Sequence, residues 1–293
     1  MLMQVWRHQQ DEQIPETPPQ RIQSPVQQQQ LGGKLVRYIK AWEIINCKDF
    51  ITKVFYQILK DNNIQERPQQ TIGQCPFQGN LTKMQAYKAM LQEELQEGKI
   101  EDIPKEQDKW WNPTFLILKS LGQWRKIFDA SLLNEIIQPI HFQMNDVQIV
   151  LYLLMSNDWA VTFDLKLAFH HLIVCPPHRA YSEFEADNHY QENITMPFGI
   201  QQSPKFLTHA LTLFCWRFAR EQTSEQLTTP TIYFFQIKIK NINIYMQHIV
   251  NTLEQFNWLI ALKKCQLTPK QKIDFLGWTW NMTEMNIFMN INW

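Results

Sequence analysis

A few residues have types and spacing that could support chemistry. They are the cysteines, one carboxylate at the end of an apolar segment, and two cations beside a turn. The five cysteines, Cys47, Cys75, Cys175, Cys215 and Cys265, form no C-x-x-C pair or Cys/His cluster. Their spacing argues against a zinc site and fits idle thiols in a reducing compartment. Asp164 ends the apolar segment Trp159–Asp164, where a carboxylate either caps a turn or offers the hard oxygens that magnesium prefers. Lys119 and Arg125 flank a Leu-Gly-Gln turn; they could contact phosphate or be ordinary exposed charges.

Four blocks of residues place Asp164 in a longer pattern. They are Trp111–Phe115 with Lys119, Trp124–Asp129 and Leu133-Asn134; then Phe163–His171; then Met196–Pro204; and finally Ile273–Trp278. In this order and spacing they resemble a reverse transcriptase, most closely that of the DIRS-like (tyrosine-recombinase) retrotransposons. Lys34–Lys60 resembles the segment that precedes the domain in that group. The resemblance implies an α+β fold: the fingers and palm of a right-hand polymerase with an antiparallel palm sheet.

The resemblance also implies which residues would serve nucleotide transfer. In the family two divalent metals, roughly 4 Å apart, hold the attacking oxygen and the leaving phosphate. Asp164 and the backbone carbonyl of Leu165 would be metal ligands, and Mg²⁺ would be the ancestral cofactor. Lys264 matches a lysine proposed to protonate the leaving pyrophosphate. A capping aspartate and a surface lysine are the plainer alternatives.

Further residues match family positions around the nucleotide and the template-primer. Lys119 and Arg125 would hold the triphosphate, and the Phe169 ring would exclude a 2′-hydroxyl. Beside the template lie the matches Pro197, Phe198 and Gly199, and on the primer grip the matches Phe275, Leu276 and Gly277. A core aromatic, a helix start and an apolar strand followed by glycine are the alternatives for these residues.

The family's remaining carboxylates are missing from this sequence. They come from a Tyr-x-Asp-Asp hairpin, expected between the helix that ends near Arg220 and the next one. Alignment on Tyr233 places Phe235 and Gln236 at the two aspartate positions, whereas alignment on Trp258 places the pair at about Pro230 and Thr231. The segment from Leu227 to Leu253 contains no Asp or Glu. We therefore expect no polymerase activity.

A frameshift is one hypothesis for this loss. Read one nucleotide earlier, the possible codons for Leu227 to Asn241 permit Asn-Tyr-Ala-Asp-Asp followed by Leu, Leu and Leu, which restores the missing hairpin. The two aspartates would fall at the Pro230–Thr231 and Thr231–Ile232 junctions. For residues 222–250 as written we expect local disorder or a poorly packed sheet edge.

The elements that must position these residues follow from apolar periodicity. Helical spacing predicts helices at Lys34–Lys60, Thr82–Gly98, Asp146–Met155, Ser203–Arg220 and Val250–Trp258. Short apolar or alternating runs predict a hairpin of Thr114–Lys119 with Trp124–Phe128, a pair of Tyr181–Glu185 with Tyr190–Thr195, and strands at Trp159–Asp164, His171–Val174, Thr231–Ile244, Ile260–Cys265 and Ile273–Trp280.

Composition bounds the domain organisation. Of 293 residues 44% are hydrophobic, enough for a real core. Residues 1–33 form a Gln/Pro-rich tail expected to be disordered, 34–80 a helical extension and loop, and 81–293 the fingers and palm. Since the chain stops at Trp293, soon after the last block, we expect the thumb to be absent or minimal. Met1–Gln10 is polar, and no run has the apolar length of a membrane span, so we expect an intracellular protein of unassigned compartment without a membrane partner.

Charge gives mixed indications about partners. The formal net charge is zero, which argues mildly against nucleic-acid binding. Between positions 230 and 280, however, six lysines face only Glu254 and Asp274: Lys238, Lys240, Lys263, Lys264, Lys270 and Lys272. Such a run is usually a solvated face.

Three functional hypotheses remain open. The first is an inactive reverse-transcriptase domain of a mobile element, whose ancestor copied RNA into DNA with Mg²⁺, deoxynucleotides and an RNA/DNA template-primer. The second is a non-catalytic palm that still binds nucleic acid. The third is that frameshifting or a corrected gene yields active protein.

Overall fold

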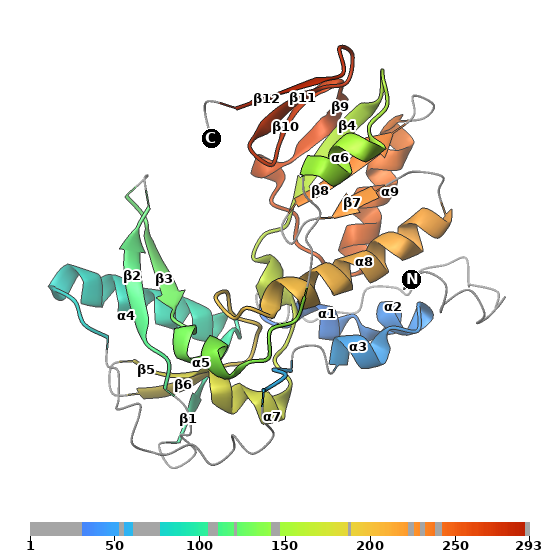
Figure 1. Ribbon diagram of the computed structural model, residues 1–293. Helices are drawn as coiled ribbons and strands as arrows, with labels where there is room; N and C mark the ends of the chain where they lie inside the picture. Colours follow the sequence, from blue (N-terminus) through green and yellow to red (C-terminus); the bar gives the residue numbers. More distant parts are fainter. Residues whose placement is uncertain are drawn as a thin grey trace.

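The fold is an arrangement of helices over small antiparallel sheets. The computed structural model describes residues 31–52, 56–60, 77–104, 111–119, 122–141, 147–186, 189–221, 226–228, 232–237 and 242–290. Figure 1 shows two lobes: one holds α4 with strands β1, β2, β3, β5 and β6, and the other holds β4 and β7–β12 with α6, α8 and α9. All the pairings between named strands are antiparallel, as the resemblance implies.

Helix α4 (Leu81–Gln96) organises the first lobe. The Asn80 side chain accepts a hydrogen bond from the backbone N–H of Lys83 at 2.9 Å and caps the first turn. Gly98, at φ +68°, lies just beyond the helix end, where a left-handed residue costs glycine least. Tyr87 and Leu91 are buried, because their spacing puts both on the face turned to the sheets.

Two small sheets complete this lobe. Strands β1 (Ile100–Ile103), β6 (His189–Asn193) and β5 (Glu183–Ala186) form one, and the hairpin of β2 (Thr114–Leu118) and β3 (Trp124–Phe128) forms the other. Short helices surround them: α5 (Ser131–Ile136), the 3₁₀ turn η3 (Ala168–His171), α7 (Pro176–Arg179) and η4 (Ala180–Ser182).

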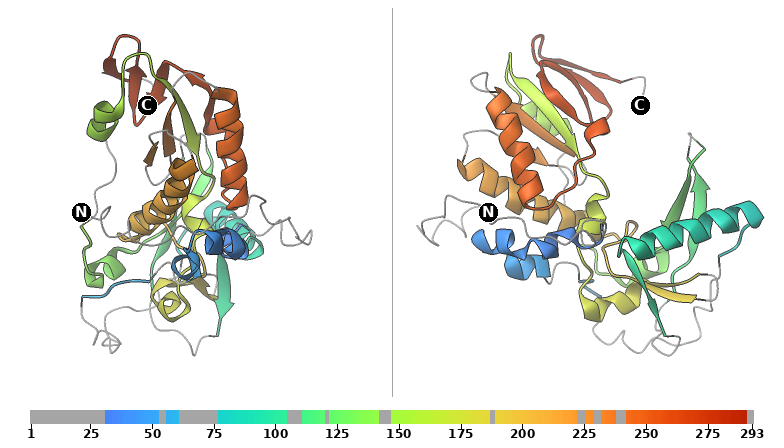
Figure 2. Two further views of the ribbon diagram at one scale, coloured as in Figure 1. Left: turned by 90° about the vertical axis from the view of Figure 1, so that its right-hand side faces the viewer. Right: turned by 180° about the vertical axis from the view of Figure 1, so that it is seen from behind.

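A four-stranded sheet of order β7-β8-β4-β9 forms the centre of the second lobe. Its strands are β7 (Gln226–Thr228), β8 (Ile232–Ile237), β4 (Trp159–Asp164) and β9 (Gln266–Lys270). The helices of this lobe are α6 (Val147–Leu153), α8 (Ser203–Glu221) and α9 (Ile242–Gln255), followed by η5 (Leu262–Lys264). Helices α6 and α9 lie on opposite sides of the sheet (Figure 2).

The end of the described chain forms a separate three-stranded sheet. Strands β10 (Lys272–Phe275), β11 (Trp278–Asn281) and β12 (Asn286–Met289) follow one another as hairpins. Phe275 and Trp280 are buried in a small core that also contains Val150 of α6 and Ala160 of β4. This core fixes the sheet against the end of the central one.

The N-terminal helices α1 (Lys34–Arg37), α2 (Ile39–Ile44) and α3 (Lys48–Thr52) pack on the main core rather than forming their own. Trp42 meets the Phe256 ring edge-on at 4.9 Å, and the Asn257 side chain donates to the carbonyl of Lys34 at 2.9 Å. Gly32 and Gly33, at the end of the segment assigned to the tail, are buried as well. Residues 1–30 lie outside the described residues, where the expected disorder stays a prediction.

Most predicted elements are present, and six need correction. The helical segment 34–60 is divided into α1, α2 and α3, and the helix predicted at 250–258 is the end of α9, which begins at Ile242. The helices at 82–98 and 203–220, the hairpin of 114–119 with 124–128, the strand pair at 181–195 and the strand at 159–164 are confirmed within a few residues. His171–Val174 is instead the end of a 3₁₀ turn with one bridge from Ile173 to Thr195. Ile260–Cys265 is mostly the η5 turn, 273–280 is a hairpin, and the strand expected over 231–244 ends at Ile237 before α9 begins.

The segment 222–250 contributes two strands to the central sheet where it is described. Strand β7 lies at the edge of the sheet, and β8 is an interior strand between β7 and β4, while the expected disorder or poor packing stays a prediction. Residues 222–225, 229–231 and 238–241 lie outside the described part of the chain. Across the described ranges, no helix combines the length and apolar character needed to cross a bilayer.

Candidate functional site

Asp164 stands at the end of β4, held by a strand on each side. Its neighbour Phe163 is fully buried and anchors the strand. The backbone N–H of Asp164 donates to the Cys265 Sγ at 3.3 Å, and its carbonyl accepts from the N–H of Ala261 at 2.7 Å. The position of this carboxylate is therefore set by main-chain contacts from the 259–265 segment.

Lys264 is the cation nearest to this carboxylate among the described ion pairs. The Lys264 Nζ lies 3.4 Å from the Asp164 Oδ2, and the lysine side chain is 75% exposed whereas the aspartate is 16% exposed. The η5 turn places Lys264 there, because its backbone N–H donates to the carbonyl of Ala261. The two residues that the sequence assigned to catalysis are thus together, as an ion pair.

Cys265 completes these surroundings and was not anticipated as part of the site. Burial raises the pKa of its thiol, and the charge of Asp164 acts in the same direction, while the hydrogen bond from the Asp164 N–H opposes it. The group is therefore a neutral thiol at ordinary pH rather than a thiolate ligand. No sequence signal marks it, since a lone cysteine in an apolar segment is usually an idle core residue.

Among the described residues, the donor set around Asp164 does not fit a pair of magnesium ions. Magnesium sites need several hard oxygens, and here one carboxylate faces a lysine ammonium. Leu165, the second assigned ligand, is buried in a bridge with Ile260. Within the described ranges, no group of three or more His, Cys, Asp or Glu side chains could hold a metal ion.

The register between β4 and β8 shows which residues lie opposite Asp164 and its neighbours. Six residue pairs match the two strands, ending with Phe163 opposite Tyr233 and Asp164 opposite Ile232. The residues just before Ile232 in the chain are Pro230 and Thr231, the pair given by ungapped alignment on Trp258. They lie outside the described residues.

Three residues assigned to the nucleotide and template form a second cluster. The Phe169 and Phe198 rings meet edge-on with centroids 5.6 Å apart, and the Arg125 guanidinium lies 5.4 Å from the Phe198 ring centre. Phe198 is 57% exposed, which is unusual for a phenylalanine. Lys119 is exposed, and its main chain closes the β2–β3 turn through bonds with Gln123 and Gly122.

The Pro197–Gly199 bend is fixed by Asn134 of the first block. The Asn134 side chain donates to the carbonyl of Gly199 at 2.9 Å and accepts from the N–H of Gln201 at 2.9 Å. Gly199 has φ +114°, and a Cβ there would lie 2.9 Å from the Phe128 carbonyl oxygen. The bend therefore requires glycine for steric reasons, and Pro197 is buried beneath it.

The residues assigned to the primer grip form the β10–β11 turn. Phe275 is buried, and its carbonyl accepts from the Trp280 indole N–H at 2.9 Å. Leu276 and Gly277 have φ of +53° and +77°, as in the tight two-residue turns that join twisted strands. No described contact joins this turn to Asp164 or to the Phe169 cluster.

Comparison with known proteins gives the same overall architecture. No family model matches the chain. A Drosophila melanogaster protein, the "Retrovirus-related Pol polyprotein from transposon 297", is 21% identical over 199 residues, 66% of this chain and 18% of that protein. The foamy viral protease-reverse transcriptase with an RNA/DNA hybrid superposes with a TM-score of 0.64 at 15% identity, over 95% of this chain and 38% of that chain. The fold is similar to that of a reverse transcriptase.

Related foamy viral structures agree with this reverse-transcriptase-like fold. The complex with dsDNA gives a TM-score of 0.62 at 14% identity, over 93% of this chain and 57% of that one. The native Prototype Foamy Virus enzyme gives 0.62 at 16% identity, over 94% and 37%. This chain spans less than two thirds of the length of each of these proteins.

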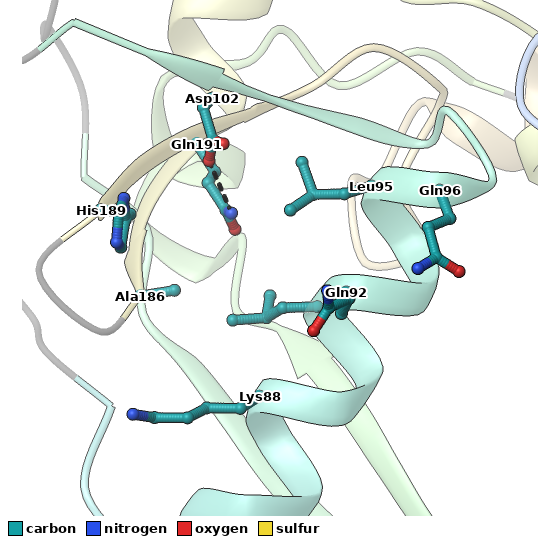
Figure 3. Close-up of a pocket in the computed structure, with 9 residues that line it drawn as sticks. Lys88, Gln92, Leu95, Gln96, Asp102, Ala186, His189 and Gln191 are labelled. Carbon is teal, nitrogen blue, oxygen red and sulfur yellow. Dashed lines mark hydrogen bonds between the residues drawn. The ribbon is translucent and has the colours of Figure 1, made fainter.

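The described residues also line two hollows, one apart from these clusters and one beside Lys264. One, of about 340 Å³, opens between α4 and the ends of β1, β5 and β6. Figure 3 shows the Gln191 amide donating to Asp102 at its upper wall, with Leu95 opposite and Lys88 below. It contains none of the assigned site residues. The other, of about 420 Å³, is lined partly by Lys264 and Cys265.

Proposed function

We propose that this chain is the fingers and palm of a retroelement reverse transcriptase whose polymerase site is incomplete. The lobe that holds α4 with β1, β2, β3, β5 and β6 corresponds to the fingers, and the lobe centred on β4 corresponds to the palm. The supporting observation is the β4–β8 register, which places Ile232 opposite Asp164 in a segment without Asp or Glu from Leu227 to Leu253. The nearest group to Asp164 is then the Lys264 ammonium rather than a second carboxylate.

The ancestral reaction would be RNA-directed DNA synthesis with Mg²⁺ and deoxynucleotides. Phe169, Phe198 and Arg125 make one continuous contact, which supports the proposal that the nucleotide-facing wall is retained with Lys119 beside it. Pro197–Gly199 would border the template, and Phe275–Gly277 the primer. The loss then concerns the metal ligands rather than the surfaces around them. In its most specific form, the proposal is that the chain comes from a DIRS-like element.

Primer extension tests the absence of polymerase activity. The full chain is incubated with an RNA template, a DNA primer, deoxynucleotides and Mg²⁺ or Mn²⁺, and we expect no extension beyond that of an Asp164→Asn control. Extension that depends on Asp164 would contradict the proposal.

A variant with two added carboxylates tests whether residues 230–231 are the position of the absent metal ligands. Replacing Pro230 and Thr231 by Asp restores two carboxylates next to Ile232 in the chain, and we expect tighter Mn²⁺ binding than in the native chain, measured by electron paramagnetic resonance. Replacing Thr268 and Gln271 by Asp gives a control of equal charge. Equal Mn²⁺ binding by the two variants would argue against a site at 230–231.

The frameshift hypothesis has its own test in the nucleotide sequence. Read one base earlier, the codons at the Pro230–Thr231 and Thr231–Ile232 junctions should encode Asp. Any other residue at both junctions removes the hypothesis, while leaving the incomplete site as it is.

A non-catalytic palm that binds an RNA–DNA duplex is the alternative. It is supported by the foamy viral structures of similar fold, which were solved with an RNA/DNA hybrid and with dsDNA. Binding should weaken as salt rises, because contacts with phosphate release counterions. The absence of duplex binding at low salt would exclude this alternative.

A further inference from the structure

We propose that Lys263, Lys264, Lys270 and Lys272 form a site for a row of phosphate groups, as carried by a single nucleic-acid strand or an inorganic polyphosphate. These four cations belong to the lysine-rich run that resembles a solvated face in sequence. In the structure all four lysines line one hollow of about 420 Å³. They therefore surround a common space instead of being spread over a solvated face. The inference goes beyond the proposed function, since it uses no metal.

The lysines are brought together by three elements of fixed geometry. Lys263 and Lys264 belong to η5, Lys270 ends β9, and Lys272 begins β10. Strand β9 is paired with β4, and β10 with β11, so the two sheets meet at the corner formed by 270–272. A charged site built on paired strands keeps its spacing better than one on a free loop.

The charge of this hollow is local rather than a property of the whole chain. The protein has a formal net charge of zero, yet four of the residues that line the hollow are lysines and one is an acid, Asp274. The Asp274 carboxylate accepts a hydrogen bond from the Thr279 hydroxyl at 2.5 Å. Even with Asp164 paired to Lys264 at the border, cations are in excess.

The remaining lining indicates phosphate rather than a base as the bound group. Thr162, Gln266 and Thr279 are polar, and apart from Ile273 and the Cys265 thiol nothing in the described lining is apolar. No aromatic ring lines the hollow, whereas proteins that hold single strands through their bases stack them on such rings. Recognition would therefore depend on charge and be independent of sequence.

The lysines are also mutually repulsive when no anion is present. They are all exposed, and ammonium groups around one hollow raise the free energy of the folded state at low salt. An anion in the hollow would relieve this repulsion. The site therefore predicts that phosphate chains stabilise the fold, and that removal of lysines does the same at low salt.

Salt-dependent binding of a labelled single strand tests the site. Fluorescence anisotropy of a 20-nucleotide poly-dT with the full chain is measured in EDTA over a range of salt. Four neutralised phosphates predict a slope of log K against log salt of about −3, because single strands give roughly −0.7 per phosphate contacted. In the double variant Lys270→Gln/Lys272→Gln the slope should fall to about half, with at least a tenfold loss of affinity at low salt.

A charge-matched variant separates this site from total charge. Lys40→Gln/Lys88→Gln changes the net charge equally but removes exposed lysines of α2 and α4, and it should leave slope and affinity unchanged. Equal loss in both double variants, or no binding of the native chain at low salt, overturns the proposal. Thermal unfolding of each variant checks that it is folded.

Competition by inorganic tripolyphosphate identifies the source of the phosphate. If tripolyphosphate displaces the strand and raises the melting temperature, the site needs only adjacent phosphates. The rise in melting temperature should be absent in Lys270→Gln/Lys272→Gln. Failure to displace a strand whose binding still depends on Lys270 and Lys272 assigns the site to nucleic acid. Because these measurements contain no divalent metal, their result is independent of primer extension, which alone tests the incomplete polymerase site.

Discussion

Lys264 and Asp164 form an ion pair, with 3.4 Å between the ammonium nitrogen and the nearer carboxylate oxygen. The lysine side chain is three-quarters exposed, so water screens the attraction and the lysine is held only weakly.

The first prediction concerns the strength of this pair. Lys264→Gln and Asp164→Asn should each change the free energy of unfolding by about 1 kcal/mol or less, because exposed pairs contribute about 0–1 kcal/mol. Urea denaturation of the two single variants and the double variant gives the coupling energy. A coupling of about 3 kcal/mol, typical of buried pairs, would contradict the exposed geometry.

The second prediction concerns Gly199 in the bend after Pro197. Gly199→Ala should destabilise the fold by about 1–3 kcal/mol, since it adds strain at positive φ and brings a Cβ within 2.9 Å of the Phe128 carbonyl. Gly122→Ala is the matched control: its φ is +75° with no atom within 4 Å of the new Cβ. Urea unfolding should show the larger loss for Gly199, and equal losses would remove the steric explanation.

These results bear on how much of the structure is readable from sequence. The stripe at Thr82–Gly98 and the alternation on either side of Gly122 predicted α4 and the β2–β3 hairpin, because local periodicity and turn chemistry agree there. The four blocks contain Asp164, Phe169, Phe198 and Arg125, and the resemblance to the family added Lys264. The ion pair and the aromatic contact were not predicted, because they join segments that are distant in the sequence.

Other elements could not be read in this way. Ile260–Cys265 is apolar enough for a strand, but it turns as η5 where Leu259 and Ala261 hydrogen-bond to the backbone around Asp164. The strand predicted over 231–244 ends early because isoleucines at 237, 239, 242 and 244 fit both periods, and short apolar runs do not separate strand from helix. The four lysines line one hollow because two sheets meet there. Sequence periodicity does not predict how two sheets pack against each other.

The third prediction concerns Asn134, which joins the first block to the third. Asn134→Ala should cost about 1–2 kcal/mol, because it removes one hydrogen bond to the Gly199 carbonyl and one from the Gln201 N–H. Asn134→Asp keeps the acceptor for Gln201 and loses the donor to Gly199, so an intermediate loss is expected in chemical denaturation. A larger loss for Asp than for Ala would show that the added charge, rather than the hydrogen bonds, dominates.

The fourth prediction concerns pH and Glu192 on β6. Burial, a hydrogen bond with Glu101 and the charge of Glu101 raise the pKa of Glu192 to about 7, although Arg179 opposes the shift and Glu183 adds to it. A carboxyl group with a raised pKa binds its proton more tightly in the folded state. Its stabilising contribution is therefore complete below about pH 4.5 and is lost as pH rises to about 7.

Glu192→Gln tests this dependence. The neutral amide should flatten the fall of stability between pH 5 and 7, with a difference from the native chain on the order of 1 kcal/mol after screening by solvent. Melting temperature against pH gives the measurement, and Glu93→Gln at an exposed position of α4 serves as the control. Parallel curves for the native chain and the Glu192 variant would exclude the raised pKa.

The pairing of strand β8 has a consequence for how a protein with an altered segment avoids degradation. Backbone pairing with β4 uses the N–H and C=O groups of the main chain, so a six-residue segment of altered sequence can occupy an interior strand if it favours extended structure. Ile232–Ile237 is rich in isoleucine and aromatic residues and does so. Cellular quality control responds to exposed apolar chain rather than to lost catalysis. A copy whose chemistry is gone but whose hydrogen-bond ladder is intact would therefore escape clearance, and selection could act on whatever surface remains.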